Sequence, residues 1–224
     1  MRTIRKHLTL ALVLSACAVA PSAFAQTVFG TKGDVVFSGE RLFGFHSTHV
    51  FEEREAPVDD YENDWTSFDL GWRGPYVVDF SPYDTPRLGF DYLIIDSLSI
   101  GGTLGFASID SDEDGPLVND ASGTAFLFAP RVGYVYMFND VIGIWPRGGF
   151  NYHSFSVDDA FTESGFGITL ECMFPIAPVQ HFGFLVGPTL DIDFAGERDY
   201  DGPLGDLDRR YRAIGIQAGV FGWL

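Results

Sequence analysis

Arginine follows proline at three places in the chain, and each time a glycine stands two residues after the arginine. The three segments are 86–89, 130–133 and 146–149, and their arginines are Arg87, Arg131 and Arg147. Acidic residues in equally apolar surroundings are Glu40, Asp91, Glu171 and Asp191. Because a charge removed from water needs an opposite charge beside it, these residues predict a salt-bridge network. Alternatively, the same charges would line a narrow conducting path and set its ion selectivity.

A second candidate is the acidic segment 110–115, which reads Asp-Ser-Asp-Glu-Asp-Gly and matches the start of a calcium-binding loop. Its twelfth position is Ala121, where a calcium loop uses a bidentate glutamate, and strands rather than helices are expected to flank it. We therefore expect a solvated acidic loop and no specific metal site. Diffuse binding of divalent cations to this and the other acidic loops stays open.

Histidine and serine, the residue types of a base and a nucleophile, come together in the segment His153-Ser154-Phe155-Ser156. In a strand, residues at i and i+3 point to opposite faces, so His153 and Ser156 cannot form a catalytic pair there. Cys172 is expected to act as a small apolar side chain. The sequence thus predicts no enzyme and no cofactor, and it marks no residue as catalytic, cofactor-binding or metal-binding.

The elements that position these residues are expected to be strands, because apolar and small or polar residues alternate along most of the chain. In residues 86–94, for example, Leu88, Phe90 and Tyr92 alternate with Arg87, Gly89 and Asp91. We expect eight strands, at residues 34–50, 85–95, 97–109, 123–137, 141–156, 165–176, 182–194 and 210–224.

One face of every expected strand is bulky and apolar, and the other is rich in glycine, threonine and charged residues. Eight strands enclose too little volume to place all the bulky side chains inside. With the faces reversed, the bulky residues contact lipid and the small or charged ones fill a narrow lumen. Because backbone groups in lipid must all be paired, the sheet must close. The fold class is therefore all-β, an eight-stranded antiparallel up-and-down transmembrane β-barrel.

The connections support this architecture, since short turns alternate with longer, mostly acidic loops at 51–85, 110–122, 157–164 and 195–209. Three features do not fit a regular barrel. Pro130, Pro146 and Pro188 fall within strands, where they predict bulges or kinks. Arg41 falls on an apolar face, which either a bulge or a position near the lipid headgroups would resolve. The segment 65–72 also alternates and could extend the sheet above the membrane, or belong to a ten-stranded barrel.

The first 25 residues predict a secretory signal peptide, with a basic start, a short apolar run and an Ala23-Phe24-Ala25 cleavage site. The barrel domain would then span residues 26–224. A lipobox-like sequence ending at Cys17 leaves lipoprotein processing as the alternative. Cleavage after Ala25 removes three basic residues and moves the formal net charge from −17 to −20. Such an acidic chain is not expected to bind nucleic acid.

The signal site, the alternating strands and the ending Gln217-Ala-Gly-Val-Phe-Gly-Trp-Leu224 together resemble small outer-membrane β-barrel proteins of the OmpA/OmpX-like class. The ending departs from that class at Gly222 and at Leu224. The resemblance implies an outer-membrane location, lipid as the surrounding partner, and a structural or surface-interaction role with acidic loops facing outward. A narrow ion channel and a periplasmic lipocalin-like binder are the alternatives, and the oligomeric state stays open.

Overall fold

The computed structural model describes residues 29–53, 60–70, 81–111, 121–158, 160–200 and 206–224. The expected signal peptide, both processing sites and most of the calcium-like segment lie outside these ranges. Within the described ranges, no helix is long and apolar enough to span a membrane.

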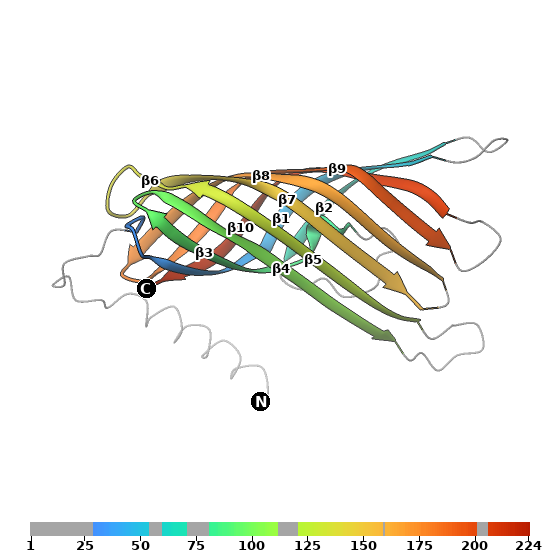
Figure 1. Ribbon diagram of the computed structural model, residues 1–224, viewed down its shortest axis with the longest axis horizontal. Helices are drawn as coiled ribbons and strands as arrows, with labels where there is room; N and C mark the ends of the chain where they lie inside the picture. The colour runs from blue at the N-terminus through green and yellow to red at the C-terminus, as the bar shows by residue number, and fades with distance from the viewer. Residues whose placement is uncertain (1–28, 54–59, 71–80, 112–120, 159, 201–205) are drawn as a thin grey trace, which may run out of the picture.

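Ten antiparallel strands and one short 3₁₀ helix make up the described chain (Figure 1). The strands are β1 (Val35–Glu53), β2 (Tyr61–Leu70), β3 (Arg87–Ile95), β4 (Leu98–Ser111), β5 (Ala121–Tyr134), β6 (Tyr136–Met137), β7 (Gly143–Val157), β8 (Phe161–Val179), β9 (Phe182–Tyr200) and β10 (Asp206–Trp223). The helix η1 (Pro82–Asp84) lies between β2 and β3.

Eight of these strands form a closed ring in the order β1, β3, β4, β5, β7, β8, β9, β10, and β10 pairs again with β1. They correspond to the eight strands expected from the sequence, so the predicted barrel is confirmed. The short turns at 96–97 and 180–181 lie at one end, here called the turn end, together with the ends of the ring at Val35 and Leu224 (Figure 1). The opposite end is called the far end.

At the far end the strands are longer than expected. β8 begins at Phe161, β9 continues to Tyr200 and β10 begins at Asp206, so two of the expected acidic loops are largely strand. Both faces of the sheet are rich in polar residues there, so no contrast of hydropathy marks these residues as strands. Because about 9–11 residues suffice to cross a bilayer, strands of 19 residues such as β8 and β9 extend well beyond it.

β1 changes its partner halfway along its length. Residues 35–40 pair with β3, and residues 43–52 pair with β2. Of the two alternatives left open for the segment 65–72, its described part, residues 65–70, belongs to a strand that extends the sheet outside the closed ring. A register shift between Gly39 and Phe43 separates the two halves, and Arg41 there has a φ of 55°. This bulge turns Arg41 inward, as anticipated, and its side chain is buried.

The three strand prolines do not mark the bulges that were one of the two expectations for them. The pairings of Pro130 with Gly102, Pro146 with Cys172 and Pro188 with Ile216 all keep the register of the strands around them. A missing N–H donor therefore costs single ladder bonds and does not shift the strands.

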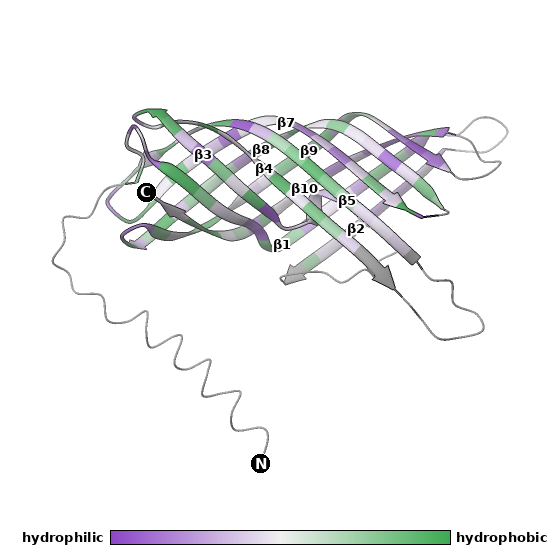
Figure 2. Cartoon of the chain, turned by 60° about the horizontal axis from the view of Figure 1, so that its bottom comes forward, coloured by the Kyte–Doolittle hydropathy of each residue, from purple (hydrophilic) through white to green (hydrophobic). Residues whose placement is uncertain are grey.

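The outer face of the ring carries an apolar band. Hydrophobic and polar residues alternate along every strand (Figure 2). Large hydrophobic side chains, one from each ring strand and each between 44% and 64% exposed, are Phe45, Phe90, Leu104, Phe128, Phe150, Leu170, Phe184 and Ile216. A continuous surface of this kind is far larger than the apolar patches that soluble monomers expose, so its surroundings are lipid.

The charged lumen as candidate functional site

Arginine side chains from β3, β5 and β7 point into the lumen, because in each strand they alternate with lipid-facing residues. Glycines two residues further along leave room for neighbouring side chains or for the backbone of an adjacent strand. A Cβ on Gly133, for example, would lie 2.5 Å from Nε1 of Trp145 and 2.9 Å from Cγ of Arg147. Each Pro-Arg-x-Gly segment thus places an arginine side chain and a glycine, which has no side chain, on the same face of the sheet.

Glu40 is the centre of the network. Its carboxylate accepts two hydrogen bonds from Arg131, at 2.8 and 2.9 Å, and two from Arg147, at 2.8 and 3.0 Å. Ser38 donates a fifth at 2.6 Å, and Arg131 also pairs with Asp91. Because all these groups are buried, they depend on one another for the hydrogen bonds that water would otherwise supply.

Arg41 belongs to a second group of charged and polar side chains in the lumen. Its Nη2 lies 2.9 Å from Asp191, and Thr169 donates to the same carboxylate at 2.6 Å. Glu171 accepts from Gln217 at 3.1 Å. It lies 3.8 Å from Nη2 of Arg41 and 2.8 Å from Nη2 of Arg147, and it therefore links the two groups. All seven charged residues predicted to face the lumen do so, and six of them form ion pairs with an opposite charge.

Arg87 is the exception. It is 2% exposed, yet its Nε and Nη2 have no hydrogen-bond acceptor among the described residues. Its guanidinium lies 6.0 Å from the centre of the Tyr83 ring, and each nearby carboxylate is held by another arginine. The alternation of the sequence predicts that Arg87 faces inward. It cannot show that the carboxylates near Arg87 already pair with other arginines.

Tyr83, on helix η1, occupies the lumen on the far side of these arginines and is fully buried. Its hydroxyl donates to Asp193 and lies 3.0 Å from Oδ1 of Asn151, and its backbone carbonyl accepts from Arg41. Residues 81–86, which precede β3, therefore lie inside the barrel, and Tyr83 plugs it. This plug could not be predicted from the sequence, because residues 81–86 contain no pattern that distinguishes them from an ordinary turn.

Nearer the far end, beyond the level of the apolar band, a further set of ion pairs crosses the lumen. Arg209 lies 2.8 Å from Glu52 and 3.3 Å from Glu163, and Arg198 donates to Glu163 at 2.8 Å. Burial alone would lower the pKa of Arg198, but the adjacent Glu163 carboxylate raises it above its ordinary value. None of these three pairs was singled out from the sequence, since they lie in segments expected to be loops.

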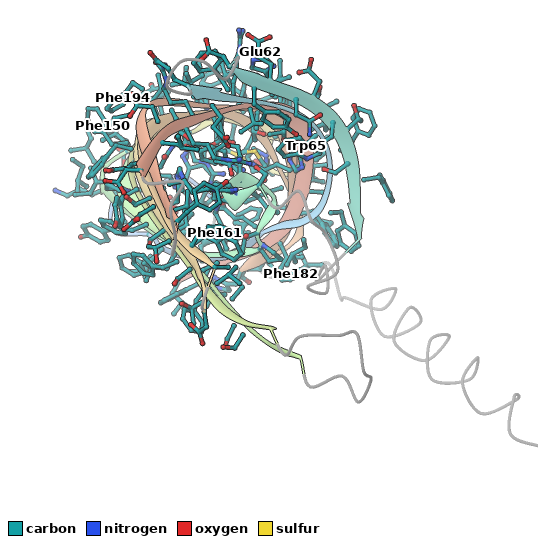
Figure 3. All side chains as sticks on the ribbon, turned by 90° about the vertical axis from the view of Figure 1, so that its right-hand side faces the viewer. Glu62, Trp65, Phe150, Phe161, Phe182 and Phe194 are labelled. Atoms are coloured by element: carbon teal, nitrogen blue, oxygen red, sulfur yellow. The ribbon has the colours of Figure 1, made fainter. Side chains whose placement is uncertain are left out.

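At the turn end the lumen is closed by apolar side chains. Phe29, which precedes β1, is inserted among rings of β7 and β10, with ring centres 5.4 Å from Trp145, 5.0 Å from Phe221 and 5.4 Å from Trp223. The other members of this cluster are Val36, Leu93, Val135, Met173, Ala177 and Leu185. Viewed along the barrel, side chains fill the interior, whereas Phe150 and Phe194 lie on the outside (Figure 3).

His153 and Ser156 lie on opposite faces of β7, as expected from the sequence. His153 is buried in the lumen, 3.9 Å from Asp193, whereas Ser156 is on the other face and contacts Thr162. The two therefore do not form a catalytic pair. Cys172 is a free thiol on the lipid-facing side, half-buried. Among the described residues no group of three or more histidine, cysteine or acidic side chains is placed to hold a metal ion.

No family model and no curated protein sequence matches the chain. Solved structures do match. Outer membrane protein OprG from Pseudomonas aeruginosa is 13% identical, with 87% of this chain and 99% of that chain covered and a TM-score of 0.50. Outer membrane protein AlkL, determined in DMPC lipid bilayers, is 10% identical, with coverage of 92% and 97% and a TM-score of 0.51. At these identities the likeness concerns the fold, which is that of small outer-membrane β-barrels.

Proposed function

We propose that this outer-membrane β-barrel has a structural or surface-interaction role, with its acidic far end at the cell surface and its lumen closed to ions. The observation that carries the proposal is the occlusion of the lumen at successive levels. The apolar cluster around Phe29, the Glu40 network and the Tyr83 plug block it one after another. Two voids within the wall and lumen are about 10 Å³ each, room for about one water molecule apiece.

The surface role rests on the far end, where the strands continue past the apolar band and carry acidic side chains. Exposed carboxylates there come from four strands, and they include Glu53, Glu62, Asp64, Glu197, Asp199, Asp206 and Asp208. Diffuse attraction of divalent cations follows from such a surface. The apolar band counts against the periplasmic binder, which would hide its bulky face inside.

Ion flux tests the closed lumen against the channel alternative. Purified barrel is reconstituted into vesicles that contain a potassium-sensitive dye, and the inserted fraction is measured by flotation and by heat-modifiable migration in SDS-PAGE. We expect the flux to equal that of protein-free vesicles. Flux that scales with the inserted protein would overturn the closed lumen and establish the channel.

Cysteine labelling on intact cells tests the orientation. In a Cys172→Ser background, we expect Asp206→Cys, at the far end, to react with a membrane-impermeant maleimide. Asp140→Cys, in the exposed turn between β6 and β7, should react only after the outer membrane is permeabilised. The reverse pattern would place the acidic end in the periplasm and refute the surface role.

A further inference from the structure

The outer wall of β8, β9 and β10 is hollowed just beyond the apolar band. The hollow has a volume of about 470 Å³, and its aromatic side is formed by Phe166 and Phe194. Both rings are more than half exposed and continue the lipid-facing band. Its other margin is charged, with Glu53, Glu197, Asp208 and Arg210.

A bulge in β9 creates the aromatic side of this groove. Phe166 pairs with Ala195 and Gly167 pairs with Asp193, so Phe194 is an extra residue between them. Asp193 turns inward to accept from the backbone of Tyr211, and both Phe194 and Ala195 face outward. Beside them, Gly196 leaves the backbone bare, since a Cβ there would lie 2.1 Å from the carbonyl oxygen of Arg209.

The charged margin holds an arrangement that the fold does not explain. Glu53 is directly opposite Asp208, and Asp208 is directly opposite Glu197, so three exposed carboxylates stand in a row across three strands. Like charges at directly opposed positions destabilise a sheet. Arg210 lies 3.6 Å from Glu53 and compensates only one of them.

We propose that this groove binds a phosphorylated glycolipid of the outer leaflet. Its acyl chains would lie on Phe166 and Phe194, because these rings extend the surface that already contacts lipid. Its phosphate would pair with Arg210, and divalent cations attracted by the acidic far end would offset the repulsion from the three carboxylates. Its sugar hydroxyls would donate to Glu197 and Asp208. A phosphorylated glycolipid combines acyl chains, a phosphate and several hydroxyl donors at the boundary between lipid and water, which are the three features that the groove would bind.

A phospholipid with an amine headgroup is the main competitor. Its ammonium group would satisfy one carboxylate, but it brings few hydroxyl donors for the row of three. The inference rests on the proposed orientation, with the far end in the outer leaflet. The cysteine labelling described above tests that orientation independently of any lipid.

Native mass spectrometry of the delipidated barrel, titrated with purified lipid A, tests the proposal. We expect one lipid A molecule per barrel, and binding at least tenfold weaker in the variants Arg210→Gln and Phe194→Ser. Dephosphorylated lipid A should bind wild type about as weakly as phosphorylated lipid A binds Arg210→Gln. The matched control is Phe106→Ser, which removes an exposed ring of β4 that lies outside the groove, and it should bind like wild type.

Three outcomes would overturn the proposal. These are equal affinity for wild type, Arg210→Gln and Phe194→Ser, an equal loss in Phe106→Ser, and stronger binding of phosphatidylethanolamine than of lipid A. Heat-modifiable migration of every variant shows that a loss of binding is not a loss of folding. If labelling places the far end at the surface but lipid A binding does not depend on the groove residues, the glycolipid site fails and the proposed function stands. If labelling places the far end in the periplasm, both fail.

Discussion

Arg87 and Arg147 occupy equivalent positions in the repeated Pro-Arg-x-Gly segments, yet the structure predicts a large loss of stability when Arg147 is replaced and almost none when Arg87 is replaced. Arg147 contributes two hydrogen bonds to Glu40 and a contact of 2.8 Å to Glu171. Removing one partner of a buried ion pair costs about 3–5 kcal/mol, because the opposite charge stays buried without it. We therefore expect Arg147→Met to lower the free energy of unfolding by about that amount.

Arg87 makes none of these contacts. Its two donors without acceptors each cost about 1–3 kcal/mol in the folded barrel, and a methionine of similar length removes that cost. The loss of long-range attraction to Asp191 and Glu171 acts in the opposite sense. We expect Arg87→Met to change the stability by less than about 1 kcal/mol in either direction.

Urea unfolding in lipid vesicles, followed by tryptophan fluorescence and by heat-modifiable migration, measures both variants on one scale. The exposed Glu62→Gln serves as a control that should leave stability unchanged (Figure 3). Equal losses for Arg87→Met and Arg147→Met would refute the reasoning, since Arg87 would then have a partner of comparable strength. Losses below about 1 kcal/mol for both would mean that water screens the whole network.

Three further predictions follow from the packing of the barrel. Gly133→Ala would bring a Cβ to 2.5 Å from Nε1 of Trp145, so about 1–3 kcal/mol of stability should be lost, whereas Gly39→Ala meets only ordinary contacts and should cost less than half a kcal/mol in urea unfolding. Phe29→Ala leaves a cavity at the turn end and should cost about 3–5 kcal/mol by the same measurement; a smaller loss would mean that the cluster collapses around it. Cys172 should react in vesicles with a lipid-soluble maleimide and not with a charged one; the reverse would show that its face of β8 contacts water.

The barrel could be predicted from the sequence because lipid reverses the usual relation between apolar residues and burial. Phe90, Arg87 and Asp91 alternate with a period of two, and that period assigns each residue to lipid or lumen once the sheet is known to close. The same alternation placed Glu40, Asp91, Arg131 and the other network residues correctly. The alternation also showed that Arg41 does not fit the apolar face of its strand, and the structure has a bulge there that turns Arg41 into the lumen.

Which charges pair could not be predicted, because pairing depends on the stagger of strands far apart in the chain. Glu40 and Arg147 are brought together only by the closed ring, and nothing local distinguishes Arg147 from the unpartnered Arg87. The Tyr83 plug was missed for a related reason. Its few residues carry no periodicity, and they are held in place by Asn151 and Asp193 from β7 and β9. At the far end, polar residues on both faces concealed the continuation of β8, β9 and β10.

The contact of Phe29 with Phe221 and Trp223 has a consequence for how the barrel assembles. Phe29 precedes the first strand and the other two rings belong to the last, so their cluster cannot form until the complete chain is available and β10 has joined β1. Contacts between residues so distant in sequence are slow to form. The formation of the apolar cluster at the turn end therefore marks the final step of folding. A chain that has lost β10 should remain an open sheet with Phe29 exposed to water.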